Sequence, residues 1–443
     1  MHKKLERSVR VVITGAVGDY GRTIVAQLKG HPLMTPAVLV DPNVGGLTEM
    51  LSDLGLESDV FALAGSREDA ERLVREDRIA LVYSESLIPW TATDVLVEAT
   101  GKISVGVMYA RSAMQAHNHV VMVSKEVDSA CGAALSEEAV AHGVNYVLAD
   151  GDQPGNLMRL TAWIDALGLD IVAVGKAGEF DLVFNPSTQS LYYRGAEYAA
   201  PGMADLLELP ENHTASHVYA RAAVVPDLKR AVAADYCEMA AVAQRLGYGA
   251  DTETMHYPIA RPAELADIYA LRKDGGILAS SSVVDVFTPL RLPGEASFAG
   301  GVFAIVRTGD PVTWKILGDK GHVVSRDGKY ACIYWPFHLM GVETPLAILR
   351  AVQEPHTQAF RPSLMMAARA SRDLEAGMNF SVQGHHHEIE GTFPVLTAVD
   401  DSASVCPYYL LDGARLRVNV TKGHMIRVDD VEYPDLRVES MHR

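Results

Sequence analysis

Short apolar runs alternate with segments of helical spacing over the first 150 residues of the chain. The apolar runs lie at residues 11–13, 37–40, 80–83, 94–99, 119–123 and 144–148. Helical spacing occupies residues 24–28, 65–75, 107–117 and 136–142 between them. Strands that alternate with helices are typical of a doubly wound α/β domain with a parallel sheet. We therefore predict such a domain over residues 1–150.

The pattern changes after about residue 155. Helical spacing at residues 157–167, 231–246 and 344–353 is mixed with β-rich segments at 171–174, 283–287, 301–307 and 330–334. This mixture predicts a second, α+β domain over residues 151–357, which the helix at 344–353 would close. Residues 358–443 then form a short β-rich module.

Three glycines separate the first apolar run from the helix that follows it. Gly15 allows a tight turn, Gly18 lets backbone amides approach a pyrophosphate at the helix N-terminus, and Gly21 allows close packing of helix on strand. This order predicts a Rossmann-type dinucleotide site, although a glycine-rich turn in an unrelated α/β domain has the same pattern. The residues expected to hold the cofactor here are Gly15, Val17, Gly18, Asp19, Tyr20 and Gly21.

An acidic residue, Asp41, ends the second apolar run. A carboxylate at this position accepts hydrogen bonds from the adenosine ribose and repels the additional phosphate of NADP. No Arg or Lys follows closely, so we favour NAD over NADP. The alternative for Asp41 is a helix or turn cap.

Further polar residues follow the later strands of the predicted sheet. Ligands bind such sheets at the carboxyl ends of the strands, so these residues should lie on the edge that carries the glycine turn. Those expected to contact the cofactor are Thr100, Gly101, Ser124 and Lys125, and Asp150 and Asp152 follow the next strand.

Two lysines are candidates for acid/base chemistry. Lys125 and Lys176 each follow an apolar strand. A lysine can exchange the proton of a carbinol and stabilise alkoxide charge if burial lowers its pKa. Lys176 is also a candidate substrate ligand. The alternative is a solvated lysine or a structural ion pair with Glu126 or Glu179.

Asp150 and Asp152 flank Gly151 in a turn after a buried strand. They could orient the catalytic lysine, bind substrate hydroxyls or hold a divalent metal, although no third metal ligand is evident nearby. The alternative is a turn that caps the next helix, since Pro154 can begin one.

His256 and His338 lie in segments that contain prolines and are candidates for proton transfer, although a lone histidine is more often structural. Arg261 is a candidate anion clamp in the substrate site and otherwise a solvated charge. The triplet at residues 385–387 is all histidine, but consecutive residues of an extended segment point to alternating faces. We therefore expect no metal there.

The chain has 39 Lys and Arg against 56 Asp and Glu, a formal charge of −17, which argues against a nucleic-acid partner. Its four cysteines lie far apart and read as reduced core residues. The N-terminus lacks a signal-peptide pattern, and no apolar run reaches the roughly 18 residues of a membrane span. We expect a cytoplasmic protein without a membrane partner.

The edge segments carry a family resemblance. Residues 97–101 (Val-Glu-Ala-Thr-Gly) with 120–126 (Val-Val-Met-Val-Ser-Lys-Glu) resemble homoserine dehydrogenase, which implies that Lys125 lies near the nicotinamide and substrate. Blocks at residues 367–377, 407–413 and 420–426 resemble a SAF domain, which implies a β-clip fold for the C-terminal module.

The full length is most similar to the homoserine-dehydrogenase-like group with a C-terminal SAF domain, some members of which are deoxyxylulose-phosphate reductoisomerase-like. The segments that carry this resemblance are residues 150–154, 173–176, 255–256, 275–278, 283–285 and 335–339. The resemblance implies NAD(P)-dependent oxidation or reduction of a small polyhydroxylated substrate, sometimes coupled to a skeletal rearrangement, in a dimer or tetramer.

We therefore predict an NAD(P)-dependent oxidoreductase that acts on a small polyhydroxylated or hydroxy-acid substrate, with or without a phosphate. The alternatives are an NADPH-dependent reductoisomerase, for which a divalent metal would be needed, and a homoserine dehydrogenase. A further alternative is a non-enzymatic, nucleotide-gated sensor or sugar-binding protein built around the SAF-like module.

Overall fold

A parallel sheet forms the N-terminal part of the computed structural model, which describes residues 7–355, 358–384, 386–399 and 404–433. The predicted boundary between residues 357 and 358 lies outside the described residues. The sheet has the order β3-β4-β2-β1-β5-β6-β7, and all its strand pairs are parallel. Its strands are β1 (Val9–Thr14), β2 (Met34–Val40), β3 (Phe61–Leu63), β4 (Ile79–Val82), β5 (Val95–Glu98), β6 (His119–Met122) and β7 (Tyr146–Leu148). The Rossmann-type α/β fold predicted from the alternating pattern is confirmed.

Helices cover both faces of this sheet, which explains why its central strands are apolar throughout. The helices are α1 (Asp19–Leu28), α2 (Val44–Asp53), α3 (Arg67–Arg75), α4 (Ile103–Gln115) and α5 (Lys125–His142), with 3-10 turns η1 (Glu85–Leu87) and η2 (Trp90–Ala92). In the described part of the chain, no helix is both long and apolar enough to cross a lipid bilayer.

Helix α5 begins earlier than the sequence pattern predicts. The spacing indicates a helix only at residues 136–142, whereas α5 runs from Lys125 to His142. Its first half carries buried polar residues such as Glu126 and Asp128 among small ones, so no apolar stripe marks it. Lys125 is therefore the first residue of a helix.

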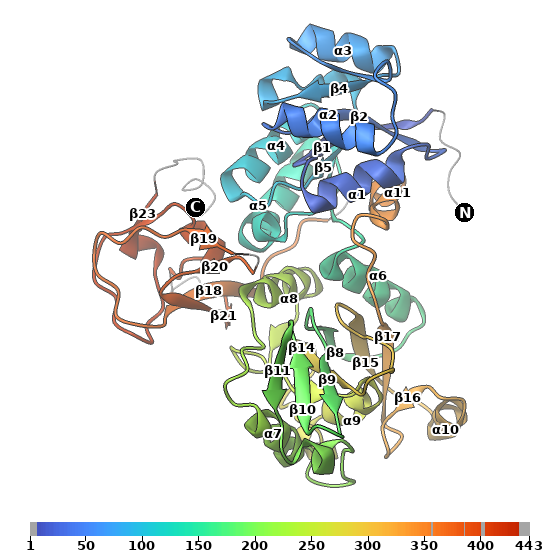
Figure 1. Cartoon of the computed structure of the whole chain (residues 1–443), viewed down its shortest axis with the longest axis vertical. Helices are drawn as coiled ribbons and strands as arrows, with labels where there is room; N and C mark the ends of the chain where they lie inside the picture. Colours follow the sequence, from blue (N-terminus) through green and yellow to red (C-terminus); the bar gives the residue numbers. More distant parts are fainter. Residues whose placement is uncertain (1–6, 356–357, 385, 400–403, 434–443) are drawn as a thin grey trace.

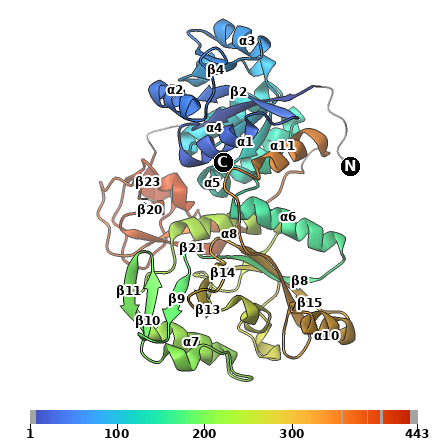
Figure 2. The ribbon, with the colours of Figure 1, turned by 45° about the vertical axis from the view of Figure 1, so that its right-hand side comes forward.

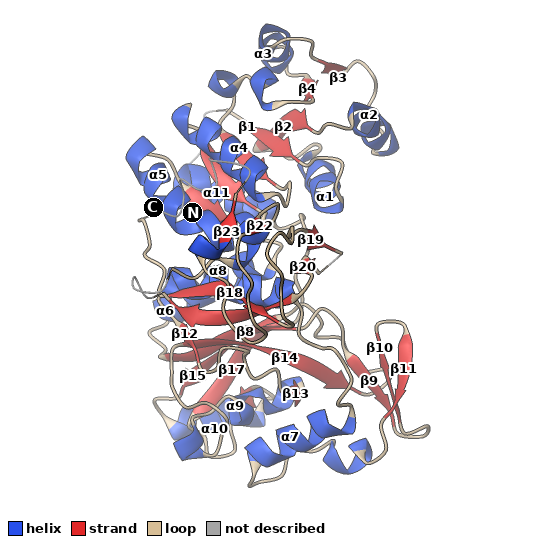
Figure 3. Cartoon of the chain, turned by 90° about the vertical axis from the view of Figure 1, so that its left-hand side faces the viewer, coloured by secondary structure: helices blue, strands red, loops and turns tan. Residues whose placement is uncertain are grey.

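The second domain is built on a large mixed sheet with helices on both faces (Figure 3). The main order is β11-β10-β9-β14-β8-β15-β17-β16, and β12 and β13 also pair with β14. The strands are β8 (Ile171–Ala177), β9 (Leu182–Asn185), β10 (Ser190–Tyr193), β11 (Ala196–Ala199), β12 (Gly249–Ala250), β13 (Ile259–Ala260), β14 (Val283–Arg291), β15 (Val302–Arg307), β16 (Val323–Val324) and β17 (Tyr330–Trp335).

The helices of this domain are α6 (Gln153–Ala166), α7 (Thr214–Val224), α8 (Ala233–Leu246), α9 (Leu265–Ile268) and α10 (Pro311–Asp319), with 3-10 turns η3 (Met203–Leu206), η4 (Pro262–Glu264) and η5 (Arg272–Asp274). Helices α6 and α8 pack on the sheet face that looks toward the N-terminal domain (Figure 2). The sequence pattern predicts that Lys176 follows a strand. Strand β8 extends to Ala177, however, so Lys176 lies within it.

Helix α11 (Thr344–Gln353) returns the chain to the N-terminal domain. It is predicted to close the second domain, but it packs beside α1 and against β6 and β7 (Figure 1). Its buried residues Ala347, Ile348 and Ala351 belong to the core beneath the glycine turn. An apolar face on this helix suits either domain, so the pattern did not distinguish them.

The C-terminal module consists of short strands around a small core. These are β18 (Leu364–Ala370), β19 (Val382–Gln383), β20 (Glu388–Ile389), β21 (Thr392–Ala398), β22 (Arg415–Leu416) and β23 (Val431–Glu432), with 3-10 turns η6 (Tyr408–Leu411) and η7 (Val428–Asp430). Strands β18 and β21 pair antiparallel and pack on α8, while η6 packs on α5. The module therefore touches both larger domains where they meet (Figures 1 and 2).

Candidate active site

The glycine turn between β1 and α1 is closely packed on its inner side. Gly15 has φ +63°, and a Cβ there would lie 2.4 Å from the carbonyl oxygen of Ala99. A Cβ on Gly21 would lie 2.3 Å from the Gly15 carbonyl oxygen, so the helix meets the strand as closely as backbone allows. Gly18 is the N-cap of α1, and the nearest atom to its Cβ position is 3.3 Å away. The turn thus presents the N-terminus of α1 outward at Gly18.

Asp41 lies beside this turn. Its carboxylate accepts hydrogen bonds from the backbone N–H of Val17 at 3.2 Å and of Asn43 at 2.9 Å. Asp19 begins α1, whereas the Tyr20 hydroxyl turns inward and donates to the Asp150 carbonyl oxygen at 3.2 Å. Tyr20 therefore joins the turn to the end of β7, while Val17 and Asp41 border the predicted adenosine side.

The loops after β5 and β6 form the continuation of the same edge. The Thr100 N–H and hydroxyl donate to the buried carboxylate of Glu98, at 3.0 and 2.5 Å. The Gly101 N–H donates to the Ser124 hydroxyl at 2.8 Å. Burial raises the pKa of Glu98. The predicted cofactor residues Thr100, Gly101 and Ser124 are thus brought together next to Lys125.

Lysines from two domains converge on one buried carboxylate. Lys125 at the start of α5 and Lys176 in β8 both donate hydrogen bonds to Glu238 of α8. Lys176 is also 2.8 Å from Asp235, one turn earlier on α8, and Lys125 is 3.6 Å from Asp152. We call these five residues, Lys125, Asp152, Lys176, Asp235 and Glu238, the lysine cluster.

The members of the lysine cluster differ in exposure. The side chains of Lys176, Asp235 and Glu238 are each 2% exposed, whereas Lys125 is 22% exposed. Of the two lysines, Lys125 therefore has the more exposed side chain.

The sequence reasoning missed Asp235 and Glu238. Both lie in a helix rich in alanine, where two acidic residues one turn apart look like a solvated face. Their signal is that the same helix has no polar stripe, since Tyr236, Cys237, Met239 and the following alanines are buried as well. A helix buried all round needs cations for its acids. The recorded hydrogen bonds of both lysines go to Glu238, while the charge of Glu126, one of the predicted alternative partners, also acts on Lys125.

Ion pairing decides the protonation state of the lysines. Burial alone favours the neutral amine, but Asp235 and Glu238 outweigh it and hold the pKa of Lys176 above its ordinary value. The pKa of Lys125 is likewise raised well above the ordinary value, against burial, by Asp152, Glu238 and Glu126. The lowered lysine pKa that was the condition for this chemistry is not found, because each ammonium faces more than one carboxylate. Both lysines are cations at neutral pH.

Glu238 carries the opposite perturbation and makes a pH prediction. Burial opposes its charge, but the two lysines lower its pKa from 4.5 to about 2. A carboxyl group with a depressed folded pKa stabilises the fold above its unfolded pKa and loses that contribution as the pH falls. Between pH 5 and pH 2 the free energy of unfolding should fall in both proteins. We expect this fall to be smaller by roughly 3 kcal/mol in Glu238→Gln than in the wild type. Urea unfolding at several pH values measures this, and equal slopes in both proteins would contradict it.

Asp152 and Asp150 have separate surroundings. Asp152 caps α6, accepting from the Gln153 N–H at 2.9 Å, and its other oxygen faces Lys125. Asp152 therefore both caps the helix and faces the lysine, which are the two roles that the sequence left open. Asp150 is fully buried and pairs with Arg350 at 2.9 Å and Arg159 at 3.6 Å. In the structure its carboxylate ties β7 to α11 and α6, rather than facing the lysines.

The other predicted side chains have partners elsewhere in the second domain. His256 binds Asp251 at 2.9 Å, and His338 Nδ1 is 2.9 Å from the Gly300 carbonyl oxygen. Arg261 is held by Glu208 at 2.9 Å and Glu295 at 2.7 Å. Within the described residues, their hydrogen bonds and ion pairs include no member of the lysine cluster.

The histidine triplet does not gather. His387 pairs with Glu126 at 2.5 Å, while His386 lies 3.7 Å from Glu179 and contacts Arg194. His385 lies outside the described residues. Over the part of the chain that the structure describes, no group of three or more His, Cys, Asp and Glu side chains is arranged to hold a metal ion.

Comparison with known families finds one matching family model, which covers most of the second domain. Residues 151–344 match the family model described as oxidoreductase DRL, catalytic domain. This segment contains Asp152, Lys176, Asp235 and Glu238, and it is similar in sequence to the catalytic part of an oxidoreductase. No curated protein matches the chain.

Among solved structures, the chain matches a DOX-P reductoisomerase with fosmidomycin and magnesium at 20% identity and TM-score 0.28, over 39% of this chain and 46% of that one. A myo-inositol dehydrogenase from Corynebacterium glutamicum matches at 16% and TM-score 0.27, over 41% and 48%. GenD2 from gentamicin A biosynthesis, in complex with NAD, matches at 12% and TM-score 0.36, over 82% and 91%. The chain thus spans about half the length of the first two structures.

Proposed function

We propose that this protein is an NAD(P)-dependent oxidoreductase that transfers hydride to or from a small polyhydroxylated or hydroxy-acid substrate. The observation that supports this most is the meeting of Lys125 and Lys176 on Glu238 at the carboxyl edge of the parallel sheet. That edge also carries the glycine turn, and ligands of such sheets bind there. The family match over residues 151–344 supports the same class of reaction.

The residues at the glycine turn fit a dinucleotide. Gly18 is the N-cap of α1 and provides no side-chain cap, so the N–H groups of the first turn suit a pyrophosphate, which the helix dipole also favours. A bound nicotinamide cofactor would supply or accept the hydride. We propose NAD as the preferred form, because the Asp41 carboxylate beside Val17 would repel a phosphate on the ribose.

The lysine cluster supplies the proton and the charge stabilisation. When hydride reaches a carbonyl carbon, negative charge develops on the oxygen, and a nearby ammonium both stabilises it and gives it a proton. We assign the proton transfer to Lys125 because its side chain is more exposed than that of Lys176, and Asp152 and Glu238 keep it protonated. Lys176, buried beneath it, keeps Glu238 charged and in place. Because Lys125 is already protonated, it is ready to donate a proton when a carbonyl is reduced.

Cofactor titration tests the proposal. We expect nicotinamide fluorescence to report binding of NADH to the full chain, with NADPH weaker, and we expect Gly18→Val to weaken NADH binding by about tenfold or more. The Cβ added at Gly18 would occupy the approach of the pyrophosphate, and it would lie 3.3 Å from the Gly15 carbonyl oxygen, which is a tight contact. Gly45→Ala in α2 is the matched control, since its Cβ meets only the Asn43 side chain, 3.8 Å away.

The outcomes separate the alternatives. Stronger binding of NADPH would overturn the assignment of Asp41 while keeping the oxidoreductase. Absence of binding by all four nucleotides NAD, NADH, NADP and NADPH would overturn the proposed function. With binding established, a screen of polyols, hydroxy acids and their keto forms identifies the substrate.

A further inference from the structure

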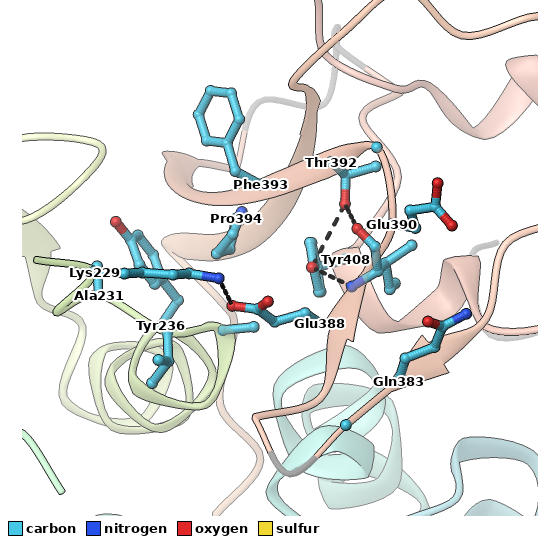
Figure 4. Close-up of a pocket in the computed structure, with 15 residues that line it drawn as sticks. Lys229, Ala231, Tyr236, Gln383, Glu388, Glu390, Thr392, Phe393, Pro394 and Tyr408 are labelled. Carbon is cyan, nitrogen blue, oxygen red and sulfur yellow. Dashed lines mark hydrogen bonds and ion pairs between the residues drawn. The ribbon is translucent and has the colours of Figure 1, made fainter. Parts of the chain in front are cut away.

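Among the described residues, four ion pairs join the C-terminal module to the second domain and to α5, and the longest of them, His386–Glu179, spans 3.7 Å. Lys229–Glu388 (2.5 Å) borders a cavity of about 660 Å³ between the module and the start of α8 (Figure 4), and Arg369–Glu253 (2.6 Å) lies beyond it. Both pairs are partly exposed to solvent, and pairs near the surface contribute little. The pair His387–Glu126, at 2.5 Å, differs because its carboxylate is only 5% exposed.

Glu126 connects the module to the lysine cluster. It directly follows Lys125 in the first turn of α5, and its carboxylate helps to hold the Lys125 ammonium charged. Among the described residues, the His387 imidazole is the hydrogen-bond partner recorded for that carboxylate. A buried carboxylate needs compensating charge and hydrogen bonds, so His387 helps to fix the geometry of this turn together with the nearby Lys125 ammonium.

A second side chain of the module covers the same face. Tyr409 of η6 is 1% exposed and packs toward α5. Its hydroxyl has no hydrogen-bond partner among the described residues. Burial raises its pKa, and the charges of Glu126 and Glu238 raise it further. The module therefore packs on α5 as well as pairing with Glu126.

We infer that the C-terminal module completes the active site through His387, a positioning residue that holds Glu126 and hence Lys125 in place while its imidazole is protonated. The inference rests on the proposed function in treating Lys125 as the proton donor. It gives the module a role in the catalytic centre and makes the assembly of that centre dependent on pH.

The charges that face His387 set the direction of this dependence. The hydrogen bond to Glu126 raises the pKa of His387 above 6.5, with Glu238 in support, while burial and Lys125 oppose it. Its loop neighbours are paired elsewhere, Glu388 with Lys229 and His386 beside Glu179. A histidine with a raised folded pKa stabilises its contact fully below the unfolded value and loses it as the pH rises through the folded value. The contact is therefore tightest below pH 6.5 and weakens as the pH rises through the raised pKa of His387.

Chemical accessibility of Lys125 tests the inference without a substrate. Reductive methylation of the full chain, read by peptide mass spectrometry, gives the labelling of Lys125 relative to the exposed Lys315 of α10. In the wild type we expect this ratio to be low near pH 6 and to rise several-fold toward pH 9. His387→Gln should show the high ratio throughout, and His387→Arg should keep it low throughout because its charge does not titrate. His386→Gln is the matched control and should follow the wild type.

A flat ratio in the wild type, or a His387→Gln protein that follows it, would overturn the inference. Rescue by His387→Arg separates a role of the charge from general loosening of the module. NADH binding, measured on the same proteins, should not change. If the wild type does not bind NADH, the proposed function is overturned, whereas a pH-dependent accessibility of Lys125 would still support the role of His387.

Discussion

Lys176→Met is expected to lower the free energy of unfolding by about 3–5 kcal/mol, the usual cost of breaking a buried ion pair from one side. Methionine fills a similar volume but leaves Asp235 and Glu238 with one ammonium fewer in a region from which water is excluded. The loss is visible in urea denaturation at neutral pH. Lys315→Met, at an exposed position of α10, should stay within about 0.5 kcal/mol of the wild type.

The double variant Lys176→Met/Asp235→Asn distinguishes charge from packing. If the cost is the uncompensated carboxylate, removing the charge of Asp235 should recover part of the stability, because Glu238 keeps Lys125. An unchanged stability in Lys176→Met would show that the lysine is not paired as described. No recovery in the double variant would assign the loss to packing.

Lys125→Met is expected to lower turnover by about 10²–10⁴-fold, the usual contribution of a positioned proton donor. The substrate oxygen would then meet neither an ammonium nor a proton, while the glycine turn and Asp41 are untouched. The affinity for NADH should therefore stay within a few-fold of the wild type, measured by nicotinamide fluorescence, and turnover by NADH consumption with the substrate that the screen identifies.

The control for this variant is again Lys315→Met, which should leave both quantities unchanged. Turnover near the wild-type rate in Lys125→Met would remove Lys125 from the mechanism. A parallel loss of NADH binding would show instead that Lys125 serves the cofactor.

Local patterns were sufficient to predict much of the parallel domain. Buried parallel strands must be apolar on both faces, so β1, β2, β5 and β6 stood out as runs. The turn at Gly15, Gly18 and Gly21 is encoded in adjacent residues, because only glycine fits where the backbone of Ala99 and Gly15 approaches so closely. Polar residues after strands then indicated one shared edge.

Local patterns misjudged the elements whose burial comes from distant partners. Helix α5 is covered by α4, α8 and the module, so its polar first turn is buried and gives no stripe. The apolar face of α11 was assigned to the second domain, whereas it completes the core of the first.

By itself, the sequence determined the order of the elements, the glycine turn and the two lysines, because each depends on neighbours a few residues away. Only the tertiary structure decided which carboxylates those lysines pair with and therefore their charge. Glu238 lies 113 residues from Lys125 and 62 from Lys176, and Glu126 meets a histidine 261 residues later. Charge in a buried site depends on the sum of such contacts, so the two candidate acid/base lysines are both held as cations.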